Sequence, residues 1–170
     1  MTQVTFQGNA VTLSGQLPTV GQAAPEVTLC GADLSDFHLK DQRGTVLVLS
    51  IVPSLDTGVC AASARKFNQE AASLKGVKVC CISEDLPFAS GRFCQAEGIS
   101  NVVCLSDYRR EGDFGRNYGV LITDGGLRGL LARAIVVVDK EGKVAYTELV
   151  SEITNEPNYA AALEAARKCA

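Results

Sequence analysis

Two apolar runs constrain the fold of this chain more than any other feature. Thr45–Val52 and Val77–Ser83 show almost no alternation with polar residues, which is typical of strands buried on both faces of a sheet. Between them apolar residues recur at steps of four and three, at Cys60, Ala64, Phe67, Ala71 and Leu74. This spacing predicts a helix from Gly58 to about Lys75, ended by Gly76. The sequence therefore predicts a strand–helix–strand unit with a right-handed crossover.

Strands and helices are also expected to alternate along the rest of the chain. Strands are expected at 27–30, 37–39 and 102–105, helices at 87–97, 112–118 and 158–168, and hairpins at 4–13 and 134–150, with a glycine-rich loop at 119–130. This order predicts one domain over residues 1–170, an α/β protein with a central mixed sheet flanked by helices. A thioredoxin-like fold with an extra N-terminal β-hairpin fits it best. A flavodoxin-like sheet is the alternative, and the late hairpin disfavours its all-parallel arrangement.

Composition excludes several classes of function. The net charge is −3 and no basic run occurs, so we expect neither nucleic acid nor an anionic membrane as a partner. The longest apolar run is far shorter than the ~20 residues of a membrane helix. The first residues lack the basic and apolar regions of a signal peptide. We therefore expect a cytoplasmic protein.

The chain has seven cysteines, an odd number that argues against the disulfide framework of a secreted protein. No Cys-x-x-Cys pair occurs and His38 is the only histidine, which argues against a zinc site. Core thiols and redox thiols remain. Five of the seven are expected in the core or, for the last, near the surface: Cys30, Cys80, Cys81, Cys104 and Cys169. Cys80 and Cys81 are adjacent in a strand, so they should face opposite sides of the sheet.

Cys60 lies where a strand turns into a helix. With Thr57 as the N-cap, Cys60 takes position N3, where free backbone N–H groups and the helix dipole favour the thiolate. Thr57 supplies a hydroxyl that can donate to the sulfur or to a bound oxygen, and Pro53 fixes the turn and shields the sulfur. Cys60 also lies on the apolar face of the helix, as a core cysteine would. Spacing alone leaves the two interpretations about equal.

The complete string, Pro53-x-x-x-Thr57-x-x-Cys60, resembles the active site of the peroxiredoxins. The longer match looks like the bacterial thiol peroxidase branch, an atypical two-cysteine type. It includes Asp56–Ser63, Lys66–Asn68, Phe6–Asn9, Asp33–Asp36, Asp85–Ala89, Arg92–Cys94, Ala132–Ala134 and Glu152–Thr154.

The resemblance implies a role for each site residue. Cys60 is the peroxidatic cysteine, whose thiolate becomes a sulfenic acid. Thr57 and the Cys60 backbone N–H hold the peroxide, and Arg133 stabilises the thiolate and the leaving oxygen. Cys94 is the resolving cysteine, which forms a Cys60–Cys94 disulfide. Judged from the residues alone, Arg133 is a solvated strand end and Cys94 a core cysteine at a helix end.

The resemblance further implies hydrogen peroxide and alkyl hydroperoxides as substrates, thioredoxin as reductant, a homodimer, and no metal or organic cofactor. We also expect the first turn of the Cys60 helix to unwind before Cys60 and Cys94 meet. Two other functions compete: a non-enzymatic redox sensor and a thiol–disulfide oxidoreductase. The missing Cys-x-x-Cys disfavours the oxidoreductase, and catalytic turnover of peroxide distinguishes the enzyme from the sensor.

Overall fold

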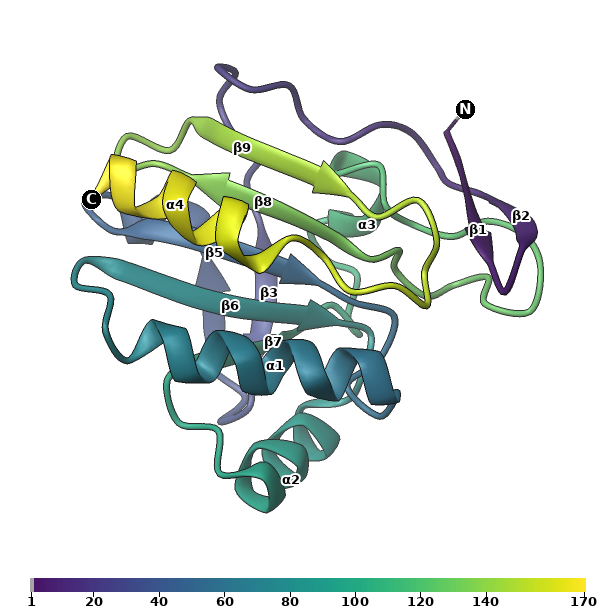
Figure 1. The fold of residues 1–170 in the computed structure, drawn as a ribbon, viewed down its shortest axis with the longest axis horizontal. Coiled ribbons are helices and arrows are strands. Elements are labelled where there is room, and N and C mark those ends of the chain that lie inside the picture. Colours follow the sequence, from purple (N-terminus) through teal and green to yellow (C-terminus); the bar gives the residue numbers. More distant parts are fainter. Residues whose placement is uncertain (1) are drawn as a thin grey trace.

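The computed structural model describes residues 2–170. Seven strands form one mixed sheet in the order β4-β3-β7-β6-β5-β8-β9 (Figure 1). Their bounds are Thr28–Gly31 for β3, Asp36–His38 for β4, Val46–Ile51 for β5, Val77–Ser83 for β6, Val102–Ser106 for β7, Ala134–Val138 for β8 and Val144–Leu149 for β9. The central strands β5, β6 and β7 are parallel, and all other neighbours are antiparallel. The predicted mixed sheet is confirmed, and the late hairpin β8–β9 rules out an all-parallel one.

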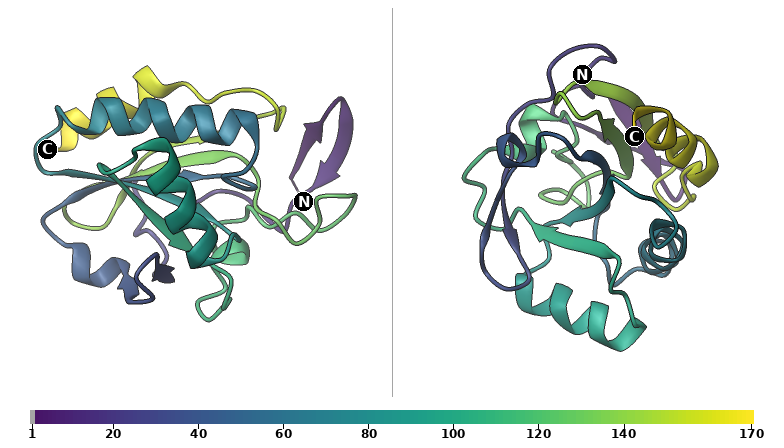
Figure 2. Two further views of the ribbon diagram at one scale, coloured as in Figure 1. Left: turned by 90° about the horizontal axis from the view of Figure 1, so that it is seen from below. Right: turned by 90° about the vertical axis from the view of Figure 1, so that its left-hand side faces the viewer.

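Three helices cover one face of this sheet (Figures 1 and 2): α1 (Gly58–Ala71), α2 (Pro87–Glu97) and α4 (Tyr159–Cys169). The chain steps from β5 to β6 to β7 in one direction, so right-handed crossovers place α1 and α2 on the same face. The short α3 (Phe114–Asn117) lies on the other face, and Leu39–Gln42 form a 3₁₀ helix. None of the helices within residues 2–170 combines the length and apolar character needed to cross a membrane.

The predicted N-terminal hairpin is confirmed as β1 (Gln3–Phe6) and β2 (Asn9–Thr12), which stand apart from the main sheet (Figure 1). Glu152 docks it through hydrogen bonds from the backbone N–H of Gly8 (2.9 Å) and the hydroxyl of Thr5 (2.9 Å). Hydrogen bonds from the N–H and hydroxyl of Thr154, together with these two, lower the pKa of Glu152 to about 2. Backbone hydrogen bonds from Thr5 to Ser151 and from Ile153 to Thr5 add to this contact, so a carboxylate and a short parallel pairing together join the two ends of the chain.

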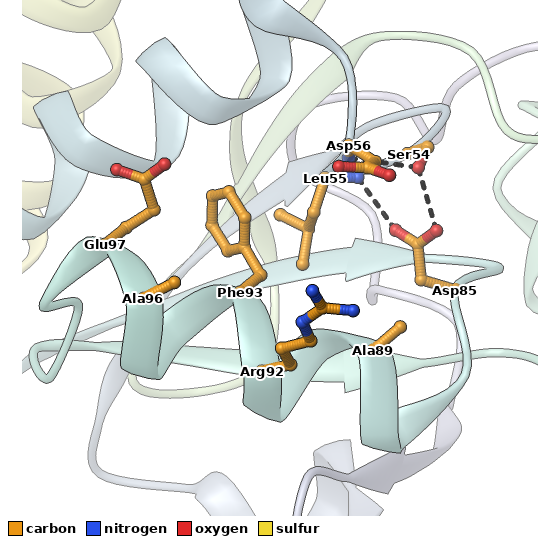
Figure 3. Close-up of a pocket in the computed structure, with 9 residues that line it drawn as sticks. All are labelled: Ser54, Leu55, Asp56, Asp85, Ala89, Arg92, Phe93, Ala96 and Glu97. Carbon is orange, nitrogen blue, oxygen red and sulfur yellow. Dashed lines mark hydrogen bonds between the residues drawn. The ribbon is translucent and has the colours of Figure 1, made fainter.

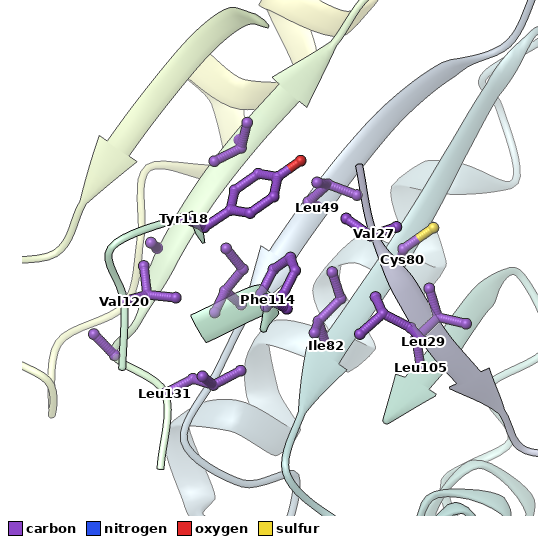
Figure 4. Close-up of a cluster of buried hydrophobic side chains, with 14 of the residues drawn as sticks. Val27, Leu29, Leu49, Cys80, Ile82, Leu105, Phe114, Tyr118, Val120 and Leu131 are labelled. Atoms are coloured by element: carbon purple, nitrogen blue, oxygen red, sulfur yellow. The ribbon is translucent and has the colours of Figure 1, made fainter. Parts of the chain in front are cut away.

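The sheet separates two apolar cores. On the α3 face, Phe114 and Tyr118 stack with ring centroids 4.5 Å apart and pack near Ile82 and Leu49 (Figure 4). The other core lies under α1 and α4. Cys80 belongs to the first core and Cys81 to the second, as their adjacent positions in β6 predicted.

Two predicted helix bounds were wrong. Helix α1 ends at Ala71 rather than near Lys75, because the N–H groups of Ser73 and Leu74 bond three residues back instead of four. Leu74 still packs on the core from outside the helix, which explains why its spacing suggested a longer one. The helix expected at 112–118 is shorter, because only the single turn α3 forms there.

Candidate active site

The carboxyl ends of the parallel strands meet at one edge of the sheet, where α/β proteins place their ligands. β5 leads there into Pro53–Cys60, and β6 leads into Glu84 and Asp85. The antiparallel strand β8 begins at this edge, since Ala134 pairs with Ile51. The topology therefore brings Arg133 to the edge that carries Cys60.

Asp85 holds the loop before α1 in place. Its carboxylate accepts hydrogen bonds from the Ser54 hydroxyl (2.8 Å) and the Leu55 backbone N–H (2.7 Å), as Figure 3 shows. The hydroxyl of Ser83 donates to the same carboxylate (2.9 Å) from the end of β6. The turn that presents Cys60 is thus fixed to the neighbouring strand.

Thr57 is the N-cap of α1, as predicted, which places Cys60 at N3. The Thr57 hydroxyl oxygen accepts from the Cys60 N–H (3.3 Å), and its proton is donated to the Ser54 carbonyl (3.3 Å). The two groups expected to hold a peroxide therefore bond to each other here. The hydroxyl must leave the Ser54 carbonyl before it can donate to a substrate.

The Cys60 side chain is fully buried in the core under α1, together with Val52 and Leu55. Pro53 is also buried, at the end of β5. One turn along α1, the Ser63 hydroxyl lies 2.7 Å from the Tyr159 hydroxyl of α4. This contact fixes the buried side of α1 to the helix beside it.

Arg133 is buried, with only 3% of its surface exposed, so the expectation of a solvated strand end was wrong. Its Nε donates to the Ile153 carbonyl (2.8 Å), whereas its Nη1 has no hydrogen-bond partner among the described residues. Arg133 also lies close enough to Tyr159 for its charge to oppose the rise that burial causes in the pKa of Tyr159. Because Tyr159 contacts α1 through Ser63, the guanidinium lies near the Cys60 helix. An unpaired buried N–H is costly and is free to bind an anion.

Cys94 lies in the last turn of α2, half-buried, and packs against the core that contains Cys60. All seven cysteines are free thiols. Cys81 lies near both residues of the expected pair: burial is the main cause that raises its pKa, and Cys60 and Cys94 raise it further. The Cys94 sulfur is 2.9 Å from the sulfur of Cys104 in β7.

A cavity of about 450 Å³ separates the loop before α1 from α2 (Figure 3). The loop contributes Ser54, Leu55 and Asp56, and α2 contributes Arg92 and Phe93 among others. The cavity therefore lies between the segments that carry Cys60 and Cys94, and it offers both apolar and charged walls.

Two neighbouring carboxyl groups, those of Glu84 and Asp107, lie at the same edge. Glu84 Oε2 and Asp107 Oδ1 are buried and receive no hydrogen bond from the described residues. Burial and the neighbouring Asp107 raise the pKa of Glu84 to about 8, although Arg110 pairs with its other oxygen at 3.1 Å. No group of three or more His, Cys, Asp or Glu in residues 2–170 is arranged to hold a metal ion.

Comparison with known proteins agrees with this geometry. The model of the redoxin family matches residues 19–163. Thiol peroxidases from Corynebacterium glutamicum and Mycobacterium tuberculosis are each 53% identical over 165 residues, which cover 97% of this chain and 99% and 98% of theirs. The chain belongs to the thiol peroxidases of the redoxin family. It is therefore an enzyme, a thiol-dependent peroxidase, and the sensor and oxidoreductase alternatives are not favoured.

Solved structures show the same thiol peroxidase fold. A peroxiredoxin-like protein from Aquifex aeolicus is 45% identical and superimposes with a TM-score of 0.93, covering 99% of this chain and 97% of that one. A thiol peroxidase from Chromobacterium violaceum, 24% identical, shares the fold with a TM-score of 0.89 over 99% and 97% of the two chains.

Sequence analysis missed three contributors to this thiol peroxidase site: Asp85 as the loop anchor, the Ser63–Tyr159 contact, and Cys104 beside Cys94. The position of Asp85 could have been predicted, because it follows β6 as Pro53 follows β5. The carboxyl ends of parallel strands lie at the same edge of a sheet, so the two segments should be neighbours. The other two depend on how α4 and α2 pack, which no local pattern indicates.

Proposed function

We propose that this thiol peroxidase reduces hydroperoxides at Cys60 and resolves the product with Cys94. The observation that best supports this is the buried Arg133 at the sheet edge that carries Cys60, with an Nη1 that no described residue satisfies. A thiolate at N3 of α1, or the charge that develops on a peroxide, is the natural partner for that N–H.

In the first step the Cys60 thiolate attacks the terminal oxygen of the peroxide. The O–O bond breaks, the distal fragment leaves as an alcohol or water after taking a proton, and Cys60 becomes a sulfenic acid. Arg133 stabilises the negative charge on the leaving oxygen. The Thr57 hydroxyl turns from the Ser54 carbonyl toward the substrate, and the Cys60 N–H is released at the same time.

In the second step the Cys94 sulfur attacks the sulfenic sulfur, water leaves, and a Cys60–Cys94 disulfide forms. The hydrogen bond from the Cys104 thiol lowers the pKa of Cys94, which favours its attacking thiolate. Since Cys60 is fully buried under α1, the first turn of this helix opens for the two sulfurs to meet. Equal amide exchange over 57–64 and 90–97 in reduced and oxidised protein would contradict this opening.

The remaining partners follow from the family and the cavity. A thioredoxin-type protein reduces the disulfide. Hydrogen peroxide and alkyl hydroperoxides are the substrates, and the apolar wall formed by Leu55, Ala89 and Phe93 suits an organic tail. The seven free thiols fit a reducing compartment such as the cytosol.

The expected homodimer can be tested directly. Phe88 and Leu86, at the start of α2, remain 72% and 54% exposed and offer an apolar contact. Light scattering of the reduced protein should give twice the chain mass. Phe88→Asp should shift the population toward the monomer if this surface is the interface.

The decisive experiment is a peroxidase assay coupled to thioredoxin. Cys60→Ser should lose all activity, whereas Cys94→Ser should still oxidise once but fail to be recycled. Cys169→Ser, which alters the thiol at the end of α4 near Asp139, at the opposite edge of the sheet, is the matched control. Full activity in Cys60→Ser would overturn the proposal.

A further inference from the structure

Cys94 and Cys104 form a pair of thiols that the folded chain already holds together. Their sulfurs are 2.9 Å apart, only about 0.9 Å more than the length of a disulfide bond. Cys94 is on α2 and Cys104 is buried in β7, and these two elements pack directly on each other. The pair is thus brought together by a helix–sheet contact.

The two sulfurs differ in a way that suits thiol exchange. The pKa of the half-exposed Cys94 is lowered, because the Cys104 thiol donates a hydrogen bond to it. The same bond and burial raise the pKa of Cys104. An accessible sulfur that attacks first, with a buried protonated sulfur behind it, is the arrangement a dithiol needs to attack and then release a partner.

A Cys60–Cys94 disulfide fits the folded chain less well than a Cys94–Cys104 disulfide does. Cys60 and Cys94 lie on different helices, α1 and α2, so the opening of the first turn of α1 proposed above has to last as long as the bond between them. The Thr57 cap on the Cys60 N–H is lost for as long as that bond lasts. A bond between Cys94 and Cys104 leaves α1 and its cap intact. Re-forming the first turn of α1 therefore favours the transfer of the disulfide from Cys60–Cys94 to Cys94–Cys104.

We propose that Cys104 takes over the disulfide from Cys60, a step that rests on the proposed roles of Cys60 and Cys94. The Cys104 sulfur attacks the Cys94 sulfur, the Cys60–Cys94 bond breaks, and Cys60 leaves as a thiolate. The proton of Cys104 goes to solvent or to Cys60. No oxidant or reductant is consumed. The product is a Cys94–Cys104 disulfide with a reduced Cys60 under a re-formed α1.

Cys81 is the other thiol near this pair. It lies in β6 beside β7, in register with Cys104. Unlike Cys104, whose sulfur is 2.9 Å from that of Cys94, it makes no hydrogen bond to either reacting sulfur within residues 2–170. The geometry therefore favours Cys104 as the acceptor.

Peptide mapping distinguishes the two disulfides. Cys94 and Cys104 lie in one tryptic peptide, residues 93–109, whereas Cys60 lies in residues 44–65. After one equivalent of hydrogen peroxide and alkylation in acid, we expect peptide 93–109 to be lighter by two hydrogens and Cys60 to be alkylated. A lasting cross-link between the two peptides, with Cys60 unavailable, would overturn the proposal. No peroxide-dependent disulfide at all would instead overturn the proposed function.

Peroxide consumption without reductant gives a second measurement. Wild-type protein should consume about two equivalents per chain, since Cys60 is regenerated once, and Cys104→Val should consume about one and accumulate the cross-link. Cys80→Val is the matched control, because Cys80 faces the opposite core, and it should behave as wild type. Equal consumption by wild type and Cys104→Val would refute the transfer. If Cys104→Val does not fold, peroxide consumption by Cys104→Ser and the wild-type peptide map test the transfer instead.

Discussion

Replacing Asp85 tests how the active-site loop is held. Its carboxylate accepts three hydrogen bonds, from the Ser54 hydroxyl, the Leu55 N–H and the Ser83 hydroxyl, at 2.7 to 2.9 Å. A hydrogen bond to a charged group contributes about 1.5–3 kcal/mol to stability. Asp85 is only partly buried, and water replaces part of each bond, so we take about 1 kcal/mol for each. Asp85→Ala should then lower the free energy of unfolding by about 3 kcal/mol.

The amide of Asp85→Asn retains an acceptor oxygen, so it should cost about half as much. Both variants should also lower kcat/KM for peroxide at temperatures where they remain folded, because Cys60 depends on this loop. Asp56→Ala is the matched control: its exposed carboxylate, in the same loop, makes no hydrogen bond or ion pair with any described residue, and its effect on stability should stay within about 0.5 kcal/mol.

The assay is urea unfolding under reducing conditions, with the midpoint read at a constant slope. A loss below about 1 kcal/mol in Asp85→Ala, or an equal loss in Asp56→Ala, would show that the three bonds do not anchor the loop.

Three further predictions concern caps and titrating carboxyl groups. Thr57→Val should cost about 1–2 kcal/mol and speed amide exchange at Cys60, whereas Thr57→Ser should not; equal exchange in both would contradict the cap. The pKa of Glu84 is raised to about 8, so its stabilising contribution is complete below about 4.5 and is lost as pH rises through 8. Urea unfolding of Glu84→Gln should show a flatter decline between these pH values, and an unchanged profile would exclude Glu84. The pKa of Glu152 is lowered to about 2, so its contribution is present above about 4.5 and is lost as pH falls toward 2. Glu152→Gln should speed amide exchange at Gly8 at neutral pH, and unchanged exchange would argue against this docking.

The sequence predicted the elements well wherever one local signal dominated. Uninterrupted apolar runs located β5 and β6, and Pro87 with Gly98 marked both ends of α2, where Gly98 takes a φ of 66°. The end of α1 was wrong because Leu74 reaches the core without belonging to the helix. An apolar residue shows that a position is buried, but it does not show which backbone conformation buries it.

The candidate site was predictable in part. Thr57 and Cys60 depend on a local motif, and the structure places them at the N-cap and N3 as expected. Arg133 carried no local sign of burial, since an arginine before an apolar strand is usually solvated, and only its family resemblance singled it out. Cys104 could not be distinguished from any other strand cysteine, because its importance lies in the helix packed over it.

The position of Arg133 depends on strand register. Successive residues of β8 face opposite sides of the sheet, so a slip of one residue against β5 would move the guanidinium to the α3 core and put Ala132 or Ala134 in its place. The irregular pairing with β9 lies at Val137 and Val138, at the far end of the strand. An insertion in the β8–β9 turn can be accommodated at this irregular pairing without changing the register at Arg133. An insertion or deletion between Arg133 and Val136 would change that register. This segment should therefore tolerate substitution far better than insertion or deletion.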